Sequence, residues 1–173
     1  ADGSVDMEEA LCGIRLRGNS TQKFPKKPFA VKLVSKASVL GMPKHKRWVL
    51  LANWMDRTML RNSVAMNIAH RVDSAYINVE GDYSGGIGWS PRGTSVEVVM
   101  DGRHVGNYYL CEQIKIDGDR VNIKDCIEDV IGDGNANPTM ADCGDLLEFD
   151  DNYDEVDKFR TARGLPCMFK DEV

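Results

Sequence analysis

Residues 14–33, with the sequence IRLRGNSTQKFPKKPFAVKL, decide how the first part of this chain folds. Two strand-like runs, 14–17 and 29–33, flank a loop that holds glycine, hydroxyl side chains and lysines. Glycine allows a backbone to approach a ligand closely, amides and hydroxyls donate hydrogen bonds, and lysines supply positive charge. The stretch therefore predicts a strand–loop–strand unit whose loop either binds an anion with several oxygens, such as phosphate, or faces solvent.

The charges are divided unevenly along the chain. Residues 13–72 carry thirteen basic residues and one acid, Asp56, whereas residues 73–173 carry nine basic and twenty-two acidic residues. The net charge of the whole chain is nevertheless only −5. This separation indicates an anion-binding surface, a charged partner, or two halves that face each other.

Composition is typical of a globular protein. The 173 residues suit one domain, the 42% hydrophobic content supports a core, and no apolar run approaches the ~18 residues of a membrane span. The five cysteines include no CxxC pair, so no zinc site is predicted. Cys126 and Cys143 are candidates for a disulfide if the chain is extracellular.

Hydrophobic periodicity predicts an α+β fold, with one long amphipathic helix against a mainly antiparallel sheet. The helix is expected over residues 57–72, with Asp56 as its N-cap. Asp101-Gly102 predicts a tight hairpin turn, and 80–94 and 124–144 are rich in turn residues and predict irregular segments. The predicted strands are 14–17, 29–34, 48–52, 95–100, 106–116, 120–123 and 146–149.

Several blocks in this order resemble one family. The most distinctive are R-G-N-S at 17–20 with P-K-K-P-F at 25–29, and W-V-L-L-A-N at 48–53. The other matching residues are Lys32-Leu33, Leu40-Gly41-Met42-Pro43, Asp56, Leu60-Arg61-Asn62, residues 96–99, Asp101-Gly102, Gly106, Tyr108, Leu110, Glu112, residues 120–123, residues 146–148 and Asp150-Asp151. Over residues 14–157 the chain resembles the CotH family, the spore-coat-protein-H type of atypical, protein-kinase-like phosphotransferases.

The resemblance implies a kinase-like fold with two lobes and a nucleotide between them. Residues 17–33 would cover the phosphates, 57–72 would be the helix behind them, and the 95–116 hairpin would lead to the lobe connection. Residues 1–123 are then the nucleotide-binding region that resembles the small lobe, and 124–173 are an insert, a connector strand and the start of a second lobe. ATP with magnesium and a protein acceptor are implied as cofactor and substrate.

The chain also departs from the family pattern. The catalytic acids and metal ligands of the family lie in the second lobe, in an Asp-containing segment and a later W-D-x-D-like segment, and neither is present here. The acidic run 150–157 lies where the family links its lobes. Residues 160–173 show no closing element, as expected of part of a longer domain. We therefore predict no catalytic or metal-binding residue in this chain and no activity of the chain alone.

Seven residues are predicted to contact the nucleotide or its phosphates. Ordinary kinases pair a strand lysine with a helix glutamate, but the predicted helix contains no Glu. Either the lysine pairs with Glu97 or Glu112, or helix arginines contact phosphate directly. Lys27 is favoured over Lys26 for phosphate contact. The candidates are Arg17, Asn19, Ser20, Lys26, Lys27, Arg61 and Glu112.

Some of these candidates have an equally adequate structural role. Asn19 and Ser20 are also typical of turn capping, and Arg61 would serve equally as a partly buried arginine bonded to backbone. Glu112 lies in an apolar strand, where an acid needs a basic partner, which favours an architectural role.

Other polar and aromatic residues give no site. The three histidines, His45, His70 and His104, are isolated and are expected at the surface, and Trp48 and Trp54 are expected in the core. Residues 133–144 begin like a calcium loop but lack its glycine and its closing glutamate.

Two other classes of function compete with the kinase hypothesis. A non-catalytic surface or adhesion module of the same fold fits the same residues. Nucleic-acid binding is disfavoured because aromatic residues are not interleaved with the cations. The resemblance alone suggests a secreted or bacterial surface location.

Overall fold

The computed structural model describes residues 3–75, 88–124 and 144–170, with the single residues Gly134, Asn137 and Thr139. The chain divides into two compact units, Ala1–Ile114 and Lys115–Val173, and each is described by itself below. The functional division expected after residue 123 stays a prediction. Within the described residues, every helix is too short or too polar to cross a membrane.

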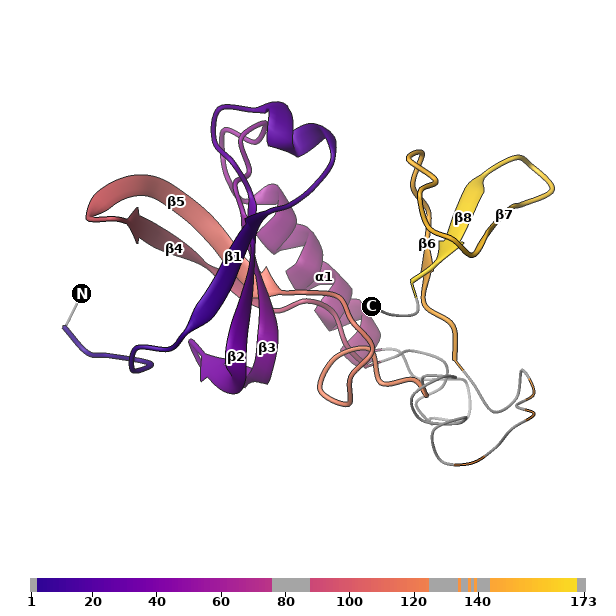
Figure 1. Cartoon of the computed structure of the whole chain (residues 1–173), viewed down its shortest axis with the longest axis horizontal. Helices are drawn as coiled ribbons and strands as arrows, with labels where there is room; N and C mark the ends of the chain where they lie inside the picture. Colours follow the sequence, from indigo (N-terminus) through magenta and orange to yellow (C-terminus); the bar gives the residue numbers. More distant parts are fainter. Residues whose placement is uncertain are drawn as a thin grey trace. The chain divides into compact units, whose positions relative to one another are not determined.

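The first unit is a five-stranded antiparallel sheet with one long helix (Figure 1). Its order, β1-β2-β3-β5-β4, places the basic strand–loop–strand at one edge and the Asp101-Gly102 hairpin at the other. The predicted α+β class with a mainly antiparallel sheet is confirmed. The elements are β1 (Cys12–Leu16), the 3₁₀ helix η1 (Ser20–Lys23), β2 (Phe29–Val39), β3 (Met42–Leu51), α1 (Arg61–Ala75), β4 (Gly93–Met100) and β5 (Arg103–Glu112).

Two tight turns set the register of the sheet. Asp101 and Gly102 have φ values of 50° and 72°, and Leu40 and Gly41 have values of 50° and 73°. Two consecutive positive φ values are typical of the type I′ hairpin turn. The first turn was predicted from its Asp-Gly sequence. For the second, the sequence indicated only a turn-like stretch at Gly41–Pro43, because leucine is unusual at positive φ, and β2 and β3 are longer than expected.

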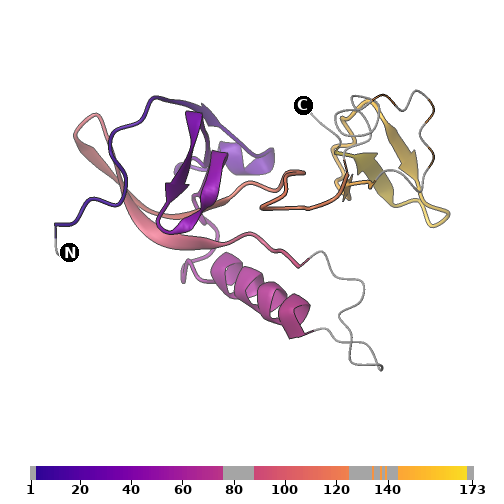
Figure 2. The same cartoon turned by 90° about the horizontal axis from the view of Figure 1, so that it is seen from below.

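The core follows the alternation of side chains along β3. Trp48 and Leu50 are buried on one face, where Leu50 packs with Tyr108. Val49 points to the opposite face and packs with Tyr109, Cys111 and Met66 of α1. Figure 2 shows α1 lying along this side of the sheet. Both faces of the end of β3 are thus covered, which explains the continuous apolar run at residues 48–51.

The helix exists as predicted, but it begins and packs differently. It starts at Arg61, four residues later than expected. Its apolar stripe remains open to solvent, since Leu60, Val64, Ile68 and Val72 are each more than half exposed. The contact with the sheet is made instead through Met66.

The second unit contains a small antiparallel sheet of order β6-β8-β7. Its strands are β6 (Leu147–Glu148), β7 (Lys158–Arg160) and β8 (Pro166–Phe169). Cys167 and Met168 of β8 are buried between its neighbours. The strand predicted at 120–123 is wrong, because the structure holds there only an isolated bridge between Ile116 and Val121.

Two expectations about single residues are also wrong. His45 is buried in β3, with an exposed fraction of 5%. Its ring is satisfied there because Nδ1 accepts a hydrogen bond from the amide of Arg47 at 3.0 Å. Trp54 is 49% exposed, whereas Trp48 is buried as expected. The possible Cys126–Cys143 disulfide, the first residues of the calcium-like loop, and residues 80–87 of the glycine-rich segment lie outside the described residues.

Candidate functional site

A pocket of about 300 Å³ lies between the β1–β2 loop, the end of β3 and the start of α1. Ligand pockets in proteins start at about this size, roughly 300–1,000 Å³. Arg17, Lys26 and Arg61, which the sequence placed in one site, line it together. The remaining lining residues are Thr21, Phe24, Pro28, Leu51, Ala52, Asn53, Trp54, Met55, Asp56 and Asn62.

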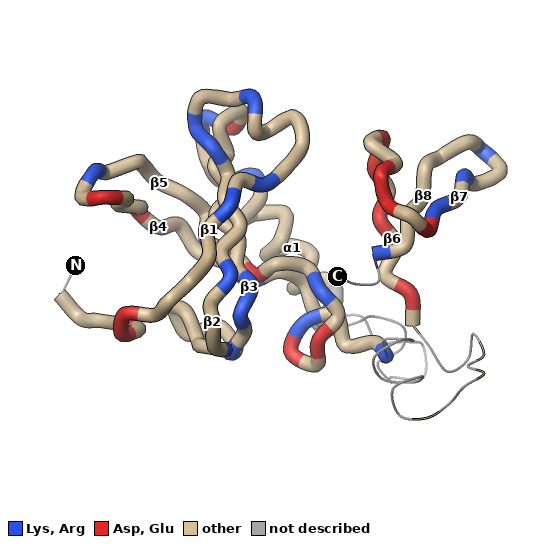
Figure 3. Tube along the Cα trace, in the orientation of Figure 1, with Lys and Arg blue, Asp and Glu red and all other residues tan. Residues whose placement is uncertain are grey.

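The loop that forms one wall of the pocket is closed by its own hydrogen bonds. The amide of Arg17 donates to the carbonyl of Pro28 at 3.2 Å, which joins the two ends of the loop. Gly18 has a φ of 81°, and a Cβ atom built there would clash with Oγ1 of Thr21. A glycine is therefore required where the chain turns into η1. Figure 3 shows Lys and Arg along this loop and the neighbouring strands.

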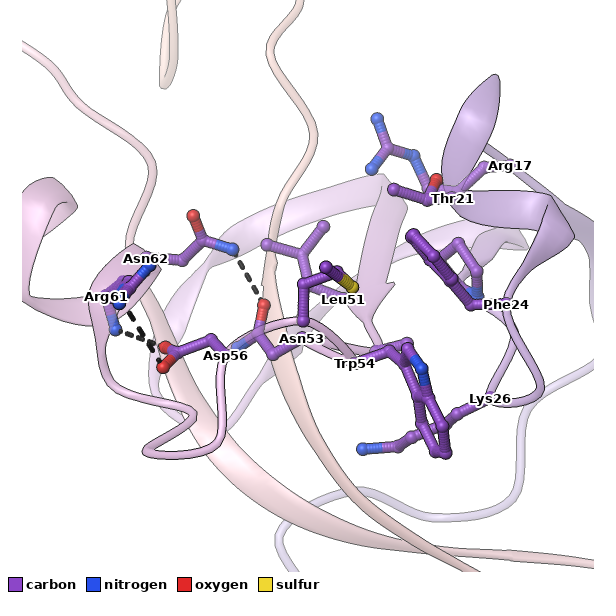
Figure 4. A pocket seen from close by; sticks show the side chains of 13 residues that line it. Arg17, Thr21, Phe24, Lys26, Leu51, Asn53, Trp54, Asp56, Arg61 and Asn62 are labelled. Carbon is purple, nitrogen blue, oxygen red and sulfur yellow. Dashed lines mark hydrogen bonds and ion pairs between the residues drawn. The ribbon is translucent and has the colours of Figure 1, made fainter.

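Arg17 is a partly buried cation of the pocket. Its guanidinium makes no hydrogen bond or ion pair with any residue that the structure describes. Figure 4 shows it with Thr21 and Phe24 on one side of the pocket, across from Arg61. A guanidinium carries five N–H donors, so this side of the pocket can accept an anion with several oxygens.

The opposite wall is built around Asp56. One carboxylate oxygen accepts the amide of Arg61, the first residue of α1, at 2.8 Å, and the other accepts the Thr58 hydroxyl at 2.7 Å. The bond from the Arg61 amide, followed by that from Thr58, holds the pKa of Asp56 below its usual value. Asp56 thus stabilises the helix start as predicted, but across a turn of five residues rather than as the adjacent N-cap.

Two asparagines continue this wall. Nδ2 of Asn62 donates to Oδ1 of Asn53 at 2.7 Å, and Asn53 has a φ of 49°, a conformation that asparagine tolerates better than most residues. The side chain of Arg61 is 84% exposed, and its Nε lies 3.8 Å from Oδ1 of Asp56. Arg61 is therefore only loosely paired and can turn toward a ligand.

Lys26 lines the pocket with its side chain, but its ammonium is already engaged. Nζ donates to the carbonyl of Asn107 in β5 and lies 4.5 Å from the centre of the Tyr108 ring. Burial lowers the pKa of Lys26, and the carboxylate of Glu97 opposes this effect.

Comparison with known families supports the resemblance seen in the sequence. A model of the CotH kinase protein family matches residues 14–163. The chain belongs to the CotH kinase protein family. A search of curated proteins gave no match. The family suggests an atypical kinase-like protein that uses a nucleotide and a metal, and the pocket lies in the first half of the matched region.

Three other residues predicted to contact the nucleotide do not line the pocket of this CotH family member: Asn19, Ser20 and Lys27. Asn19 and Ser20 are exposed on the loop, and the Asn19 carbonyl accepts the amide of Gln22 at 3.4 Å, consistent with a turn-forming role. Lys27, favoured from the sequence, donates to the carbonyl of Gln22 at 2.7 Å and so ties the loop to itself. Their predicted contacts with nucleotide stay predictions.

Glu112 is fully buried in β5 and pairs with Arg92. Nε and Nη2 of Arg92 donate to the two carboxylate oxygens at 3.0 and 2.9 Å, and the Arg92 amide donates at 2.9 Å. The expected basic partner therefore exists, but it is neither a loop lysine nor a helix arginine. Glu97, the other acid considered, pairs with His104 at 2.5 Å.

The pocket also contains residues that were not selected from the sequence. Trp54 and Phe24 supply aromatic surface, and Asn53 and Asn62 supply amides. Asn53 and Asn62 belong to the family blocks quoted above, which was a usable signal. Trp54 gave none, because its exposure depends on the turn between β3 and α1.

The described residues do not gather a metal site. They contain no cluster of three or more His, Cys, Asp or Glu side chains that could hold an ion. Asp56, the acid in the pocket lining, already accepts bonds from Arg61 and Thr58. The pocket therefore fits phosphate oxygens better than it fits a magnesium ion.

Proposed function

We propose that this chain is the ATP-binding lobe of a CotH-type atypical protein kinase, and that the pocket holds phosphate groups of the nucleotide. The observation that carries the proposal is the half-buried Arg17, which lines the pocket and whose guanidinium makes no hydrogen bond or ion pair with any residue that the structure describes. A cation in that position gains most from an anionic ligand with several acceptor oxygens.

The other pocket residues complement this role. Arg61 is loosely held and can approach the same anion from the opposite wall. Thr21 and Asn62 offer a hydroxyl and an amide, which donate to phosphate oxygens. At about 300 Å³ the pocket suits part of a nucleotide rather than the whole molecule.

The chain supplies binding rather than chemistry in this proposal. Phosphoryl transfer needs phosphates neutralised by metal and a residue that positions the acceptor hydroxyl. We assign neither task to a described residue, since Asp56 is committed to the start of α1. The acceptor would be a protein that is secreted or displayed on a bacterial surface, which rests on the family resemblance alone.

The test is a calorimetric titration of the protein with a non-hydrolysable ATP analogue and magnesium. Arg17→Gln should weaken binding by about tenfold or more, because charge-assisted hydrogen bonds are lost. Arg15→Gln is the matched control, because Arg15 lies in β1, two residues before Arg17, but outside the pocket lining. It should bind like the wild type.

Two outcomes would contradict the proposal. Equal affinities of Arg17→Gln and wild type would remove Arg17 from the site. A folded wild-type protein that binds no nucleotide would favour the non-catalytic surface module instead.

A further inference from the structure

Lys26 is a loop residue whose charged end reaches a distant strand. Its Nζ donates to the carbonyl of Asn107, 81 residues away in sequence, and lies over the ring of Tyr108 at 4.5 Å. A bond to a carbonyl and a cation–π contact act on the same ammonium group. These two contacts connect the β1–β2 loop to β5.

The surface that receives Lys26 is fixed by the core. Tyr108 is only 3% exposed, and its ring packs against Phe29 with the ring centres 6.1 Å apart. Gly106 has a φ of 112°, and a Cβ atom added there would lie 3.8 Å from Cε of Lys26. The end of the lysine stem therefore lies beside Gly106 of β5, within van der Waals distance of where a Cβ atom would be.

Acidic and polar groups complete the surroundings of the ammonium. Burial lowers the pKa of Lys26 and the Glu97 carboxylate raises it. Glu97 is held by the ring of His104 at 2.5 Å and by the side-chain amide of Asn107 at 3.1 Å. The ammonium has thus exchanged part of its hydration for a carbonyl, an aromatic ring and a nearby carboxylate.

The other lysines of the loop behave differently. Lys27 donates to Gln22, a residue of the same loop. Lys23 is exposed and makes no side-chain bond to any residue that the structure describes. Removing the charge of Lys23 should therefore leave the loop where it is, whereas removing the charge of Lys26 separates the loop from β5.

We infer that Lys26 is a positioning residue that fastens the β1–β2 loop to β5 and so keeps Arg17 over the pocket. Its consequence for nucleotide binding rests on the function proposed above, but the fastening itself does not. In this arrangement Arg17 contacts the anion, and Lys26 acts through the loop that carries it.

The fastening is tested by hydrogen–deuterium exchange of the nucleotide-free protein. Lys26→Met retains most of the apolar stem but removes the ammonium, so amides of residues 18–28 should exchange on the order of tenfold faster. Lys23→Met should leave these amides unchanged, and amides of α1 should be unchanged in both variants. Unchanged exchange of the loop in Lys26→Met would overturn the inference.

A second variant covers the case in which Lys26→Met does not fold. Lys26→Arg keeps the charge and the donors, so its loop amides should exchange more slowly than the unprotected amides of an unfolded peptide and close to the rate of the wild type. The inference would fail if the amides of residues 18–28 in Lys26→Arg exchanged as fast as unprotected amides while those of α1 stayed protected. In that case the charge and the donors at position 26 would not be what holds the loop.

Nucleotide titrations of the same variants separate this inference from the proposed function. Arg17→Gln should lose affinity while its nucleotide-free loop exchanges like that of the wild type. Lys26→Met should lose affinity and also exchange faster. Lost affinity in Lys26→Met with unchanged loop exchange would make Lys26 a direct phosphate ligand and overturn its positioning role. A wild-type protein that binds no nucleotide would refute the proposed function, and the exchange result would still decide the fastening.

Discussion

Two arginines of the first unit, Arg92 and Arg17, differ in whether the protein supplies a partner for the guanidinium. Arg92 lies beside β5 and donates three hydrogen bonds to Glu112, a carboxylate that is completely buried. Arg17 follows β1 at the other side of the sheet and faces a pocket without a bond to any described residue. A buried carboxylate must be paired to be stable, whereas a guanidinium next to solvent need not be.

The difference separates architecture from binding. The bonds from Arg92 satisfy both carboxylate oxygens of the buried Glu112, so this pair serves the fold. Arg17 keeps its donors available, at a position that the loop and Gly18 hold in place. Glu112 and Arg17 fell into one candidate set at the level of sequence, because a sequence does not reveal which charge has a partner inside the protein.

Glu112→Gln should have the largest effect on stability. It leaves Arg92 without its carboxylate and places a neutral amide in a fully buried site, so the free energy of unfolding should fall by about 3 kcal/mol. Urea denaturation followed by tryptophan fluorescence measures this change. Glu97→Gln is the control, since Glu97 forms an exposed pair and should change stability little. Similar losses of unfolding free energy in both variants would show that the buried pair contributes no more to stability than the exposed one.

Gly18→Ala tests whether the pocket side is also preformed. Alanine at a φ of 81° is strained, and its Cβ would clash with Oγ1 of Thr21, which lines the pocket. We expect a loss of about 2 kcal/mol from the strained backbone and the displaced hydroxyl together. Gly41→Ala is the matched control, because Gly41 has a φ of 73° but open space around its Cβ position, and it should lose about 1 kcal/mol. Equal losses in a thermal melt would show that Thr21 moves aside freely.

Much of the first unit could be predicted from local patterns. The Asp101-Gly102 turn, the strand–loop–strand and the existence of the helix follow from turn chemistry and periodicity. Arg17, Lys26 and Arg61, three of the seven candidates, line one pocket, and their contact with nucleotide stays a prediction. For the turn, the strand–loop–strand and the helix, the signal lies within a few neighbouring residues.

What could not be predicted depends on contacts between distant residues. The engagement of the Lys26 ammonium depends on Asn107 and Tyr108, which are far away in sequence. The pairing of Glu112 with Arg92 depends on how β5 lies against the residues just before β4. The apolar stripe of α1 correctly indicates a helix, but periodicity does not say what covers it, and Val64 and Ile68 remain exposed.

Asp56→Asn should have the smallest effect and should depend on pH. The pKa of Asp56 is lowered in the folded state by the Arg61 amide and then by Thr58, so its carboxylate stabilises the folded protein above the ordinary pKa of 3.8. This contribution is lost as the pH falls through the lowered value, when the group is protonated in both states. The stability difference between wild type and Asp56→Asn should therefore be present at about pH 6 and should shrink as the pH falls toward about pH 2.

Urea midpoints of the two proteins at both pH values measure this difference, with helix content followed by circular dichroism. Asp151→Asn is the control, because Asp151 is an exposed carboxylate of the second unit and should show no difference at either pH. The amide side chain of the Asp56→Asn variant would still offer an oxygen to the Arg61 amide, so the helix should persist and only the charge-dependent part should disappear. A stability difference that stayed constant down to about pH 2 would mean that Asp56 supports α1 through its shape and not through its charge. The role of Asp56 would then differ both from that of the buried Arg92–Glu112 pair and from that of Arg17 in the pocket.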